Sequence, residues 1–478
     1  MLTRALVRRY PVLSNRDFRL LLADRVLAPM ASSFSLVGVS FAVLAATRSA
    51  AHPAGSTADL SYVLAAQIGP SLIFLLVGGV IADRMAPQRV IIAANLLIAV
   101  GEGTFGVLVL TTHPSIWVMV GLEVLTGTGM AVFYPASMAL LPRLVPSEQL
   151  QQAAALSRLT MNAATMAGAA LAGVTVALFG SGWALAVCGV GMLGTVPLLM
   201  AIRVRPLEVI REHAPSMLRE LREGWSEFRS HTWLWATVLQ FTVVLAAWYG
   251  GFQVLGPAVA KAHLGGAAAW GLIASAESIG LIVGGVVSLR LTPSRPILFV
   301  ALAGAAIAVS PLSLAMLLPL PVILLTSFAL GIAIEMMSVI WNVTMATKIP
   351  ADMLARVSAY DGLGSMMGMP VGALVAGPIA AAIGVSATQY GAALITLVAS
   401  GLALIPREVR TMRMDAENPG QASASGQAAV PWAVPVPAAG AQGAAAVAQG
   451  GDLGASADGV AEVLTPALTG VDGAWLSL

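Results

Sequence analysis

Six acidic residues and one arginine fall inside long apolar segments of this 478-residue chain. An ionised side chain at the middle of a bilayer costs about 2.5–3.5 kcal/mol on insertion scales, so such residues should face a bundle interior and serve a function. A carboxyl removed from water favours its protonated form, and an ionised one can pair with a cation. The candidates for proton coupling or substrate contact are Asp24, Arg25, Glu102, Glu123, Glu277, Glu335 and Asp361.

Structural roles remain open for each of these residues. Glu123 and Glu335 also suit structural hydrogen bonds, and Glu102 and Glu277 suit packing or gate contacts. Asp24 could pair with a cation near one membrane surface. Asp361 is expected near the start of a helix, where a negative charge suits the helix dipole.

Composition excludes a water-soluble protein. Hydrophobic residues make up 58% of the chain, charged residues 10%, and mean hydropathy is +0.86, whereas soluble proteins carry roughly 25% charged residues. The single cysteine, Cys188, excludes an internal disulfide. Neither lysine follows a glycine, so a G-x-x-x-x-G-K-[ST] phosphate loop is absent. No catalytic cluster or cofactor fingerprint is found. We therefore expect no enzyme, cofactor, metal or nucleic-acid partner.

The elements that must position these groups are membrane helices, each needing about 20 apolar residues. We predict an all-α integral membrane fold with twelve spans, at about 19–46, 60–82, 90–111, 115–140, 153–179, 182–202, 232–256, 267–289, 296–317, 321–345, 357–382 and 386–406. The expected domains are a cytoplasmic N-terminus at 1–18, six-helix bundles at 19–202 and 232–406, a cytoplasmic amphipathic linker at 203–231 and a disordered Ala/Gly/Pro-rich tail at 407–478.

The basic residues set the predicted orientation. Arg25 lies within the first span, and Arg48 and Lys261 fall on one side of the membrane. The other lysines and arginines, Arg158 among them, are assigned to the side of the N-terminus. By the positive-inside rule that side is cytoplasmic, so both termini are expected inside.

The two halves of the chain repeat one another. VGGVIADRMAPQR at 77–89 matches VGGVVSLRLTPSR at 283–295, an offset of 206. At an offset of 204, Gly127, Pro146, Leu150, Gly168, Gly173 and Gly180 match Gly331, Pro350, Leu354, Gly372, Gly377 and Gly384. Parallel repeats of six spans are typical of one large transporter fold, whose substrate site lies between the halves near the bilayer midplane.

The motif GVIADRMAPQR at 79–89 resembles the loop signature of the major facilitator superfamily. NRDFRLLLADRVL at 15–27, the stretch 133–173, RELREGWSEFRSHTWL at 219–234 and the stretch 349–380 resemble the bacterial branch with enterobactin exporters and macrolide efflux proteins. The resemblance spans about 15–406. It implies that the fourth and tenth helices, with Glu123 and Glu335, line the cavity. It also implies a gating loop of Gly79, Asp83, Arg84 and Arg89; a tight charged turn is the alternative.

Two positions depart from that family pattern. The Gly-Pro that many drug antiporters have in the fifth helix reads Gly168-Ala169 here, and Glu123 stands where many proton-coupled relatives have an arginine. Uncharged side chains that could line a cavity for an amphipathic ligand, though each also suits packing, are Tyr134, Asn162, Gln240, Trp248, Phe252, Trp341 and Asn342.

We expect a secondary transporter of a bacterial plasma membrane that functions as a monomer. It would export a small amphipathic or cationic compound, such as a drug, a macrolide-like metabolite or a siderophore, by alternating access in exchange for protons. A proton-coupled nutrient importer and a non-transporting sensor or scaffold remain alternatives.

Overall fold

The structure is a computed structural model that describes residues 11–49, 55–84, 86–204, 217–288, 290–291 and 293–413, all within the unit Met1–Ala433. Most of the predicted N-terminal segment 1–18, residues 205–216 of the linker and residues 414–478 of the tail lie outside the described residues. Eleven helices in the described part are long and apolar enough to cross a membrane. The long apolar helix α3 completes the predicted twelve.

Six uninterrupted helices form the first half of the bundle. They are α2 (Arg16–Ala46), α3 (Thr57–Arg84), α4 (Pro87–Thr111), α5 (Ile116–Leu140), α6 (Ser147–Phe179) and α7 (Ser181–Met200). Short 3-10 turns, η1 (Pro11–Ser14) and η2 (Leu141–Arg143), precede α2 and α6. Asn15 begins α2, because its side chain accepts hydrogen bonds from the backbone N–H groups of Asp17 and Phe18 and so satisfies two donors of the first turn.

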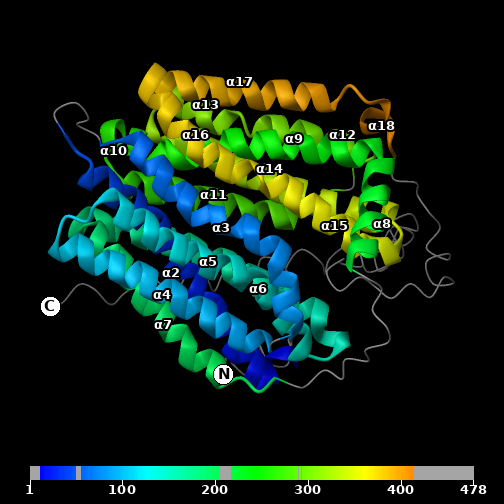
Figure 1. Cartoon of the computed structure of the whole chain (residues 1–478). Coiled ribbons are helices and arrows are strands. Elements are labelled where there is room, and N and C mark those ends of the chain that lie inside the picture. Colours follow the sequence, from blue (N-terminus) through cyan, green and yellow to red (C-terminus); the bar gives the residue numbers. More distant parts are fainter. Residues whose placement is uncertain are drawn as a thin grey trace, which may run out of the picture. The chain divides into compact units, whose positions relative to one another are not determined.

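The second half also has six spans, but three of them are interrupted. The first span comprises α9 (Thr232–Trp248), the π-helix η3 (Tyr249–Val254) and α10 (Gly256–His263); the third comprises α12 (Pro296–Ala306) and α13 (Val309–Ala315); the fifth comprises α15 (Ala351–Met366) and α16 (Gly368–Ile383). The uninterrupted spans are α11 (Ala267–Ser288), α14 (Leu320–Lys348) and α17 (Val385–Ala403), and α18 (Arg407–Thr411) follows them. Figure 1 shows this group above α2–α7.

Glycines explain why the first span of this half can bulge. A Cβ on Gly250 would lie 2.8 Å from the carbonyl oxygen of Gly372, and one on Gly251 would lie 2.7 Å from the Cβ of Ala392. The backbone of the π-helix therefore lies against α16 and α17, closer than residues with side chains at these two positions would allow. Neighbouring helices and local π geometry satisfy the freed backbone groups of such breaks.

The predicted repeat is confirmed by matching structural roles. Gly180 and Gly384 have φ of +93° and +92°, and each forms the sharp joint between the fifth and sixth spans of its half. Gly168 packs against Met30 of α2, while its counterpart Gly372 packs against Ala246 of α9. Residues 204 positions apart therefore make equivalent contacts in the two halves.

The outer surface of the bundle is apolar. Trp117, Leu178, Val190, Met200 and Ile405 are each at least 66% exposed. Large apolar side chains exposed on this scale would aggregate in water, and they show that this surface faces lipid.

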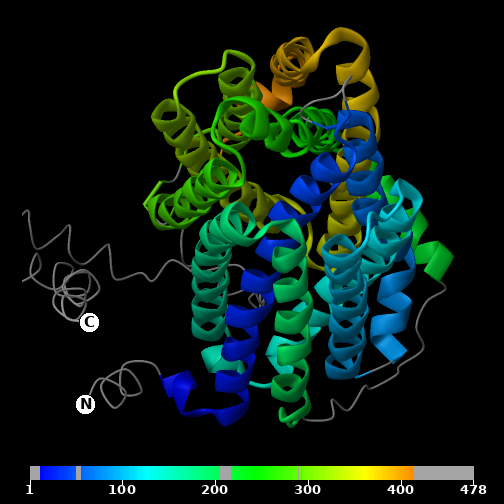
Figure 2. The same ribbon diagram turned by 90° about the vertical axis from the view of Figure 1, so that its left-hand side faces the viewer.

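Two helix pairs make the largest contacts between the halves: α6 packs on α11 and α3 packs on α16. Figure 2 shows the blue α3 beside the yellow α16. Gly377 of α16 donates its N–H to Ser61 of α3 at 2.6 Å, and Lys261 of α10 donates to the carbonyl of Leu44 at 2.7 Å. We call the end of the bundle that holds Arg16, Arg89, Arg203 and Arg407 the basic end. The two bonds between the halves lie at the opposite end.

Two basic residues that the sequence assigns to the sides of the membrane lie within helices. Arg158 lies eleven residues after the start of α6, inside the helix, and Lys261 lies in α10, which continues the span to His263. Both side chains are long enough to reach across to the other half, so each can be accommodated within a span. The predicted linker helix is present as α8 (Met217–Ser230). Its Trp225 and Phe228 stack on one another, and both pack against Tyr360 of α15.

Candidate functional site

Two acidic side chains of the first half are joined in one buried network. Ser35 of α2 donates its hydroxyl to Glu102 of α4. Gln67 of α3 donates to Glu123 of α5 at 2.8 Å and to the Ser35 hydroxyl at 3.3 Å. Both glutamates are fully buried. Four helices thus place two carboxyl groups around one amide and one hydroxyl.

The network has fewer donors than its carboxyl groups can accept. Glu102 Oε2 and Glu123 Oε1 are buried and have no hydrogen-bond partner in the described structure. Neither glutamate has an ion-pair partner among the described residues. Two uncompensated negative charges in a low-dielectric interior are unfavourable, since an unpaired buried charge costs several kcal/mol. A bound proton would both lower that charge and supply a missing donor.

Close helix contacts hold this network together. A Cβ on Gly127 of α5 would collide with the carbonyl oxygen of Gln67, and one on Gly129 would lie 2.7 Å from the carbonyl oxygen of Ala94 on α4. Glycines two positions apart therefore bring α5 against α3 and α4 at once. Small residues at helix crossings allow this approach in membranes.

Arg25 does not serve as the cation of this network. Its guanidinium donates to the carbonyl of Ser137 at 3.1 Å and to the sulfur of Met161 at 3.4 Å. It lies ten residues before Ser35, or about 15 Å along a helix, and ties α2 to α5 and α6. The adjacent Asp24 is buried, and its Oδ1 has no hydrogen-bond partner in the described structure.

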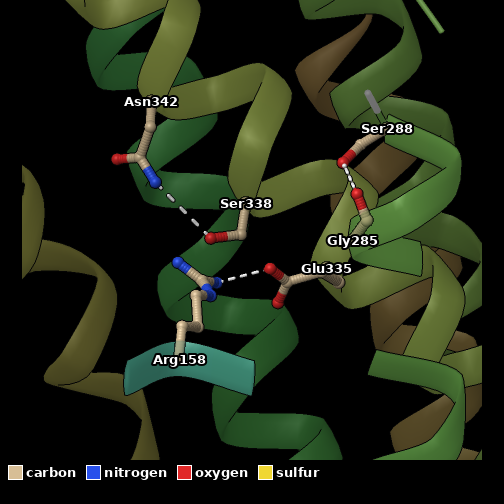
Figure 3. A network of polar contacts seen from close by, with 6 residues as sticks. All are labelled: Arg158, Gly285, Ser288, Glu335, Ser338 and Asn342. Carbon is tan, nitrogen blue, oxygen red and sulfur yellow. Dashed lines mark hydrogen bonds and ion pairs between the residues drawn. The ribbon is translucent and has the colours of Figure 1, made fainter. Parts of the chain in front are cut away.

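Glu335 of the second half forms an ion pair across the two halves. Its Oε1 lies 2.6 Å from the Nη2 of Arg158 on α6. Figure 3 shows the two side chains pointing toward one another, with Ser338 and Asn342 further along α14. A Cβ on Gly284 of α11 would lie 2.7 Å from the carbonyl oxygen of Ile332 and 3.1 Å from the Cβ of Glu335, so the first glycine of the repeated pair lets α11 approach α14 here.

The other predicted acids are in separate places. Asp361 lies ten residues after the start of α15 rather than in its first turn, so the helix-dipole interpretation is wrong. It accepts hydrogen bonds from the indole of Trp341 at 3.1 Å and from Ser365 at 3.4 Å. Glu277 is half-buried on α11, where its backbone packs against Gly331 of α14.

The uncharged candidates also divide. Trp248 and Phe252 stack beside Trp270, in an apolar cluster that includes Phe34 and Phe41 of the first half. Gln240 binds the carbonyl of Ala301 and the hydroxyl of Ser400 within its own half. Asn162 is half-buried, and the amide of Asn342 reaches Ser338 of the same helix at 3.5 Å.

The predicted gating loop is only partly described. Gly79, Asp83 and Arg84 belong to α3, and Arg89 is exposed in the first turn of α4. The side chains of Asp83, Arg84 and Tyr134 lie outside the described part of the structure, so the contacts predicted for them stay predictions.

Sequence reasoning missed Ser35, Gln67 and Arg158. Gln67 and Arg158 are polar residues within predicted spans, and that signal could have added both to the candidates. Ser35 follows two other small polar residues in the chain, and nothing in its pattern distinguishes it from them.

The chain is similar to one known family and to two characterised relatives. The family model of the Major Facilitator Superfamily matches residues 26–365. The enterobactin exporter EntS of Escherichia coli O6:K15:H31 is 28% identical over 369 residues, which cover 75% of this chain and 85% of that protein. Macrolide efflux protein A of Streptococcus pyogenes is 24% identical over 337 residues, covering 68% and 80%.

Solved structures agree on the fold. A D-xylose-proton symporter superposes with a TM-score of 0.63 at 13% identity, covering 83% of this chain and 99% of that one. The nucleoside transporter NupG gives a TM-score of 0.62 at 11% identity, covering 83% and 100%. At such low identities these structures show a common arrangement of helices.

Proposed function

Because the chain belongs to the Major Facilitator Superfamily, and is therefore a membrane transporter rather than an enzyme, we propose that it exports a small amphipathic or cationic compound in exchange for protons. The relatives named above as an enterobactin exporter and a macrolide efflux protein support export. They also suggest the cargo class: a siderophore, a macrolide-like metabolite or another drug-sized compound.

The observation that best supports proton coupling is the Glu102–Ser35–Gln67–Glu123 network. It holds two fully buried carboxyl groups, each with an oxygen that lacks a hydrogen-bond partner in the described structure. Neither carboxyl group is paired with a cation among the described residues. Such a site favours one or more bound protons. Release of a proton would leave a charge that a cationic cargo can neutralise, and this exchange is antiport.

The proposed cargo path runs between the halves. Glu335 and the aromatic side chains of Trp248 and Phe252 belong to helices of the second half that meet the first half. Asp24, Glu277, Asp361, Asn162 and Asn342 stay candidates for contact along this path. Aromatic side chains with a few charged groups suit an amphipathic compound, since ligand sites combine apolar walls with few polar groups.

We assign the protein to the bacterial plasma membrane, as a monomer with both termini in the cytoplasm. The basic end described above supports this orientation, because cytoplasmic segments carry an excess of Lys and Arg. On this assignment, the bonds of Ser61 and Lys261 between the halves lie toward the outside. The described contacts then resemble a state closed on that side.

The gating role proposed for Asp83 has its own test. Asp83→Asn should lower transport while expression and membrane insertion persist, since the charge is needed for the change of state and not for folding. Unchanged transport in this variant would contradict the gating role.

Reconstitution tests the proposed function directly. Purified protein in liposomes, under an imposed proton gradient, should accumulate at least one compound from a panel of cationic drugs, macrolides and siderophores. A variant lacking residues 415–478 should transport equally well, whereas a scaffold would depend on its tail. Transport of no compound under either gradient direction would contradict export, and movement of cargo in the direction of proton flow would favour the importer.

A further inference from the structure

The ion pair between Arg158 and Glu335 is asymmetric in its environment. The Arg158 side chain is 57% exposed and that of Glu335 only 9%. Arg158 lies about 17 Å from the start of α6, and Glu335 about 20 Å from the end of α14, at 1.5 Å per residue. The start of α6 and the end of α14 both lie at the basic end of the bundle, so the pair joins the halves well inside the bundle.

The length of the Arg158 side chain makes this contact possible. Across the halves α6 packs on α11, and α14 packs on α11 within its own half. Arg158 therefore reaches past α11 to meet Glu335. A tilt of α6 about its crossing with α11, where Gly173 packs against Gly271, would separate the two charges.

Separation affects the two partners unequally. The Arg158 side chain is more than half exposed, and a long arginine side chain can turn its guanidinium toward water when the carboxylate is withdrawn. Glu335 would keep a buried negative charge with no counter-ion, which is strongly unfavourable. A proton is the smallest species that can neutralise it there.

We propose that Arg158 is a positioning residue, a counter-cation that one half supplies to the buried carboxylate of the other, so that Glu335 binds a proton only when the halves part at this level. This inference rests on the proposed proton coupling and adds the element that links it to movement. It assigns a role to Arg158, whose partner changes from Glu335 to water during the cycle.

Other ionisable groups near α14 must be distinguished from Glu335. The helices packed against α14 contribute Glu277 on α11 and Asp352, Arg356, Tyr360 and Asp361 on α15, and α14 itself ends in Lys348; α12 and α13 contribute none. Because these groups remain in the Arg158 and Glu335 variants below, a difference between those variants reports the pair itself.

The test measures the distance between the halves without cargo. Spin labels at Ala155→Cys on α6 and Val343→Cys on α14 occupy exposed positions, and the native Cys188 is buried. In lipid nanodiscs at neutral pH the unmodified pair should give mainly the short distance. Arg158→Gln or Glu335→Gln should lower that population about fivefold, as expected for the loss of about 1 kcal/mol.

Two further variants sharpen the result. The exchange Arg158→Glu with Glu335→Arg should restore the short distance. Arg356→Glu disrupts a similar pair, Arg356 to Glu223 at 2.8 Å, that does not join the halves, and it should leave the distance unchanged. Acidification should part the halves in the unmodified protein but have no further effect in Glu335→Gln.

Unchanged distances in both single variants would overturn the proposal, as would equal pH dependence with and without Glu335. These outcomes differ from a failure of the proposed function. If no compound is transported but the distances change as expected, the positioning role of Arg158 stands without proton-driven export. If export occurs but the distances do not respond, the coupling lies elsewhere.

Discussion

Glu123 accepts a hydrogen bond of 2.8 Å from Gln67, and Gly127, one turn further along α5, packs against the carbonyl of that same Gln67. The backbone and the side chain of Gln67 are therefore both fixed by α5. This explains how an amide can be held between a carboxyl group and the Ser35 hydroxyl in an apolar bundle. The geometry of the proposed proton site depends on a helix crossing that only glycine permits.

Gly127→Ala should therefore disturb both the fold and the site. The added methyl group collides with backbone, which cannot rotate away, so we expect a loss of about 1–3 kcal/mol. Thermal unfolding in detergent measures the effect. Gly121→Ala, on the same helix, is the matched control, because a Cβ there meets nothing within 4 Å. Equal melting temperatures for both variants would contradict the crossing.

Gln67→Leu keeps the size of the side chain and removes its donors. Glu123 then loses its hydrogen bond, which costs about 1–3 kcal/mol for a buried group, and proton release during transport should fall. The comparison is Thr128→Val on α5, whose hydroxyl donates to the carbonyl of Val124 in the same helix. If the two variants release protons equally well, Gln67 is not part of the coupling network.

Gly173→Val should impair movement between the halves. A Cβ at this position would lie 2.8 Å from the carbonyl of Ala267 and 3.0 Å from the Cα of Gly271, across the α6–α11 crossing. We expect normal membrane insertion but at least a tenfold lower transport rate, equivalent to about 1.4 kcal/mol. Gly391→Val on α17, where nothing lies within 4 Å, should transport normally. Normal transport by Gly173→Val would show that the crossing can widen freely.

Sequence alone predicts the span positions well, because bilayer thickness sets the length of each apolar run. It also predicts the repeat, since Gly180 and Gly384 need the same positive φ. The breaks at Tyr249–Val254 and Met367 were not predicted. Glycine and proline occur in continuous membrane helices too, and what decides is the packing of a neighbour such as α16.

The composition of the site was only half predictable. Glu102 and Glu123 are recognisable as buried acids, but their shared network depends on how α4 and α5 are rotated and how closely they pack. Arg158 is counted with the cytoplasmic charges because it lies near the start of its predicted span, where an arginine usually follows the positive-inside rule. Its pairing with Glu335 is a contact between residues far apart in the chain, which no local pattern reveals.

The most direct test of proton-driven export is the proton release of everted membrane vesicles energised by respiration, on addition of cationic drugs, macrolides and siderophores. We predict that at least one compound releases protons from vesicles with the native protein, and that Glu123→Gln at equal expression abolishes the release. Release that persists in Glu123→Gln would remove Glu123 from the coupling. No release with any compound, from vesicles that contain the native protein, would contradict proton antiport.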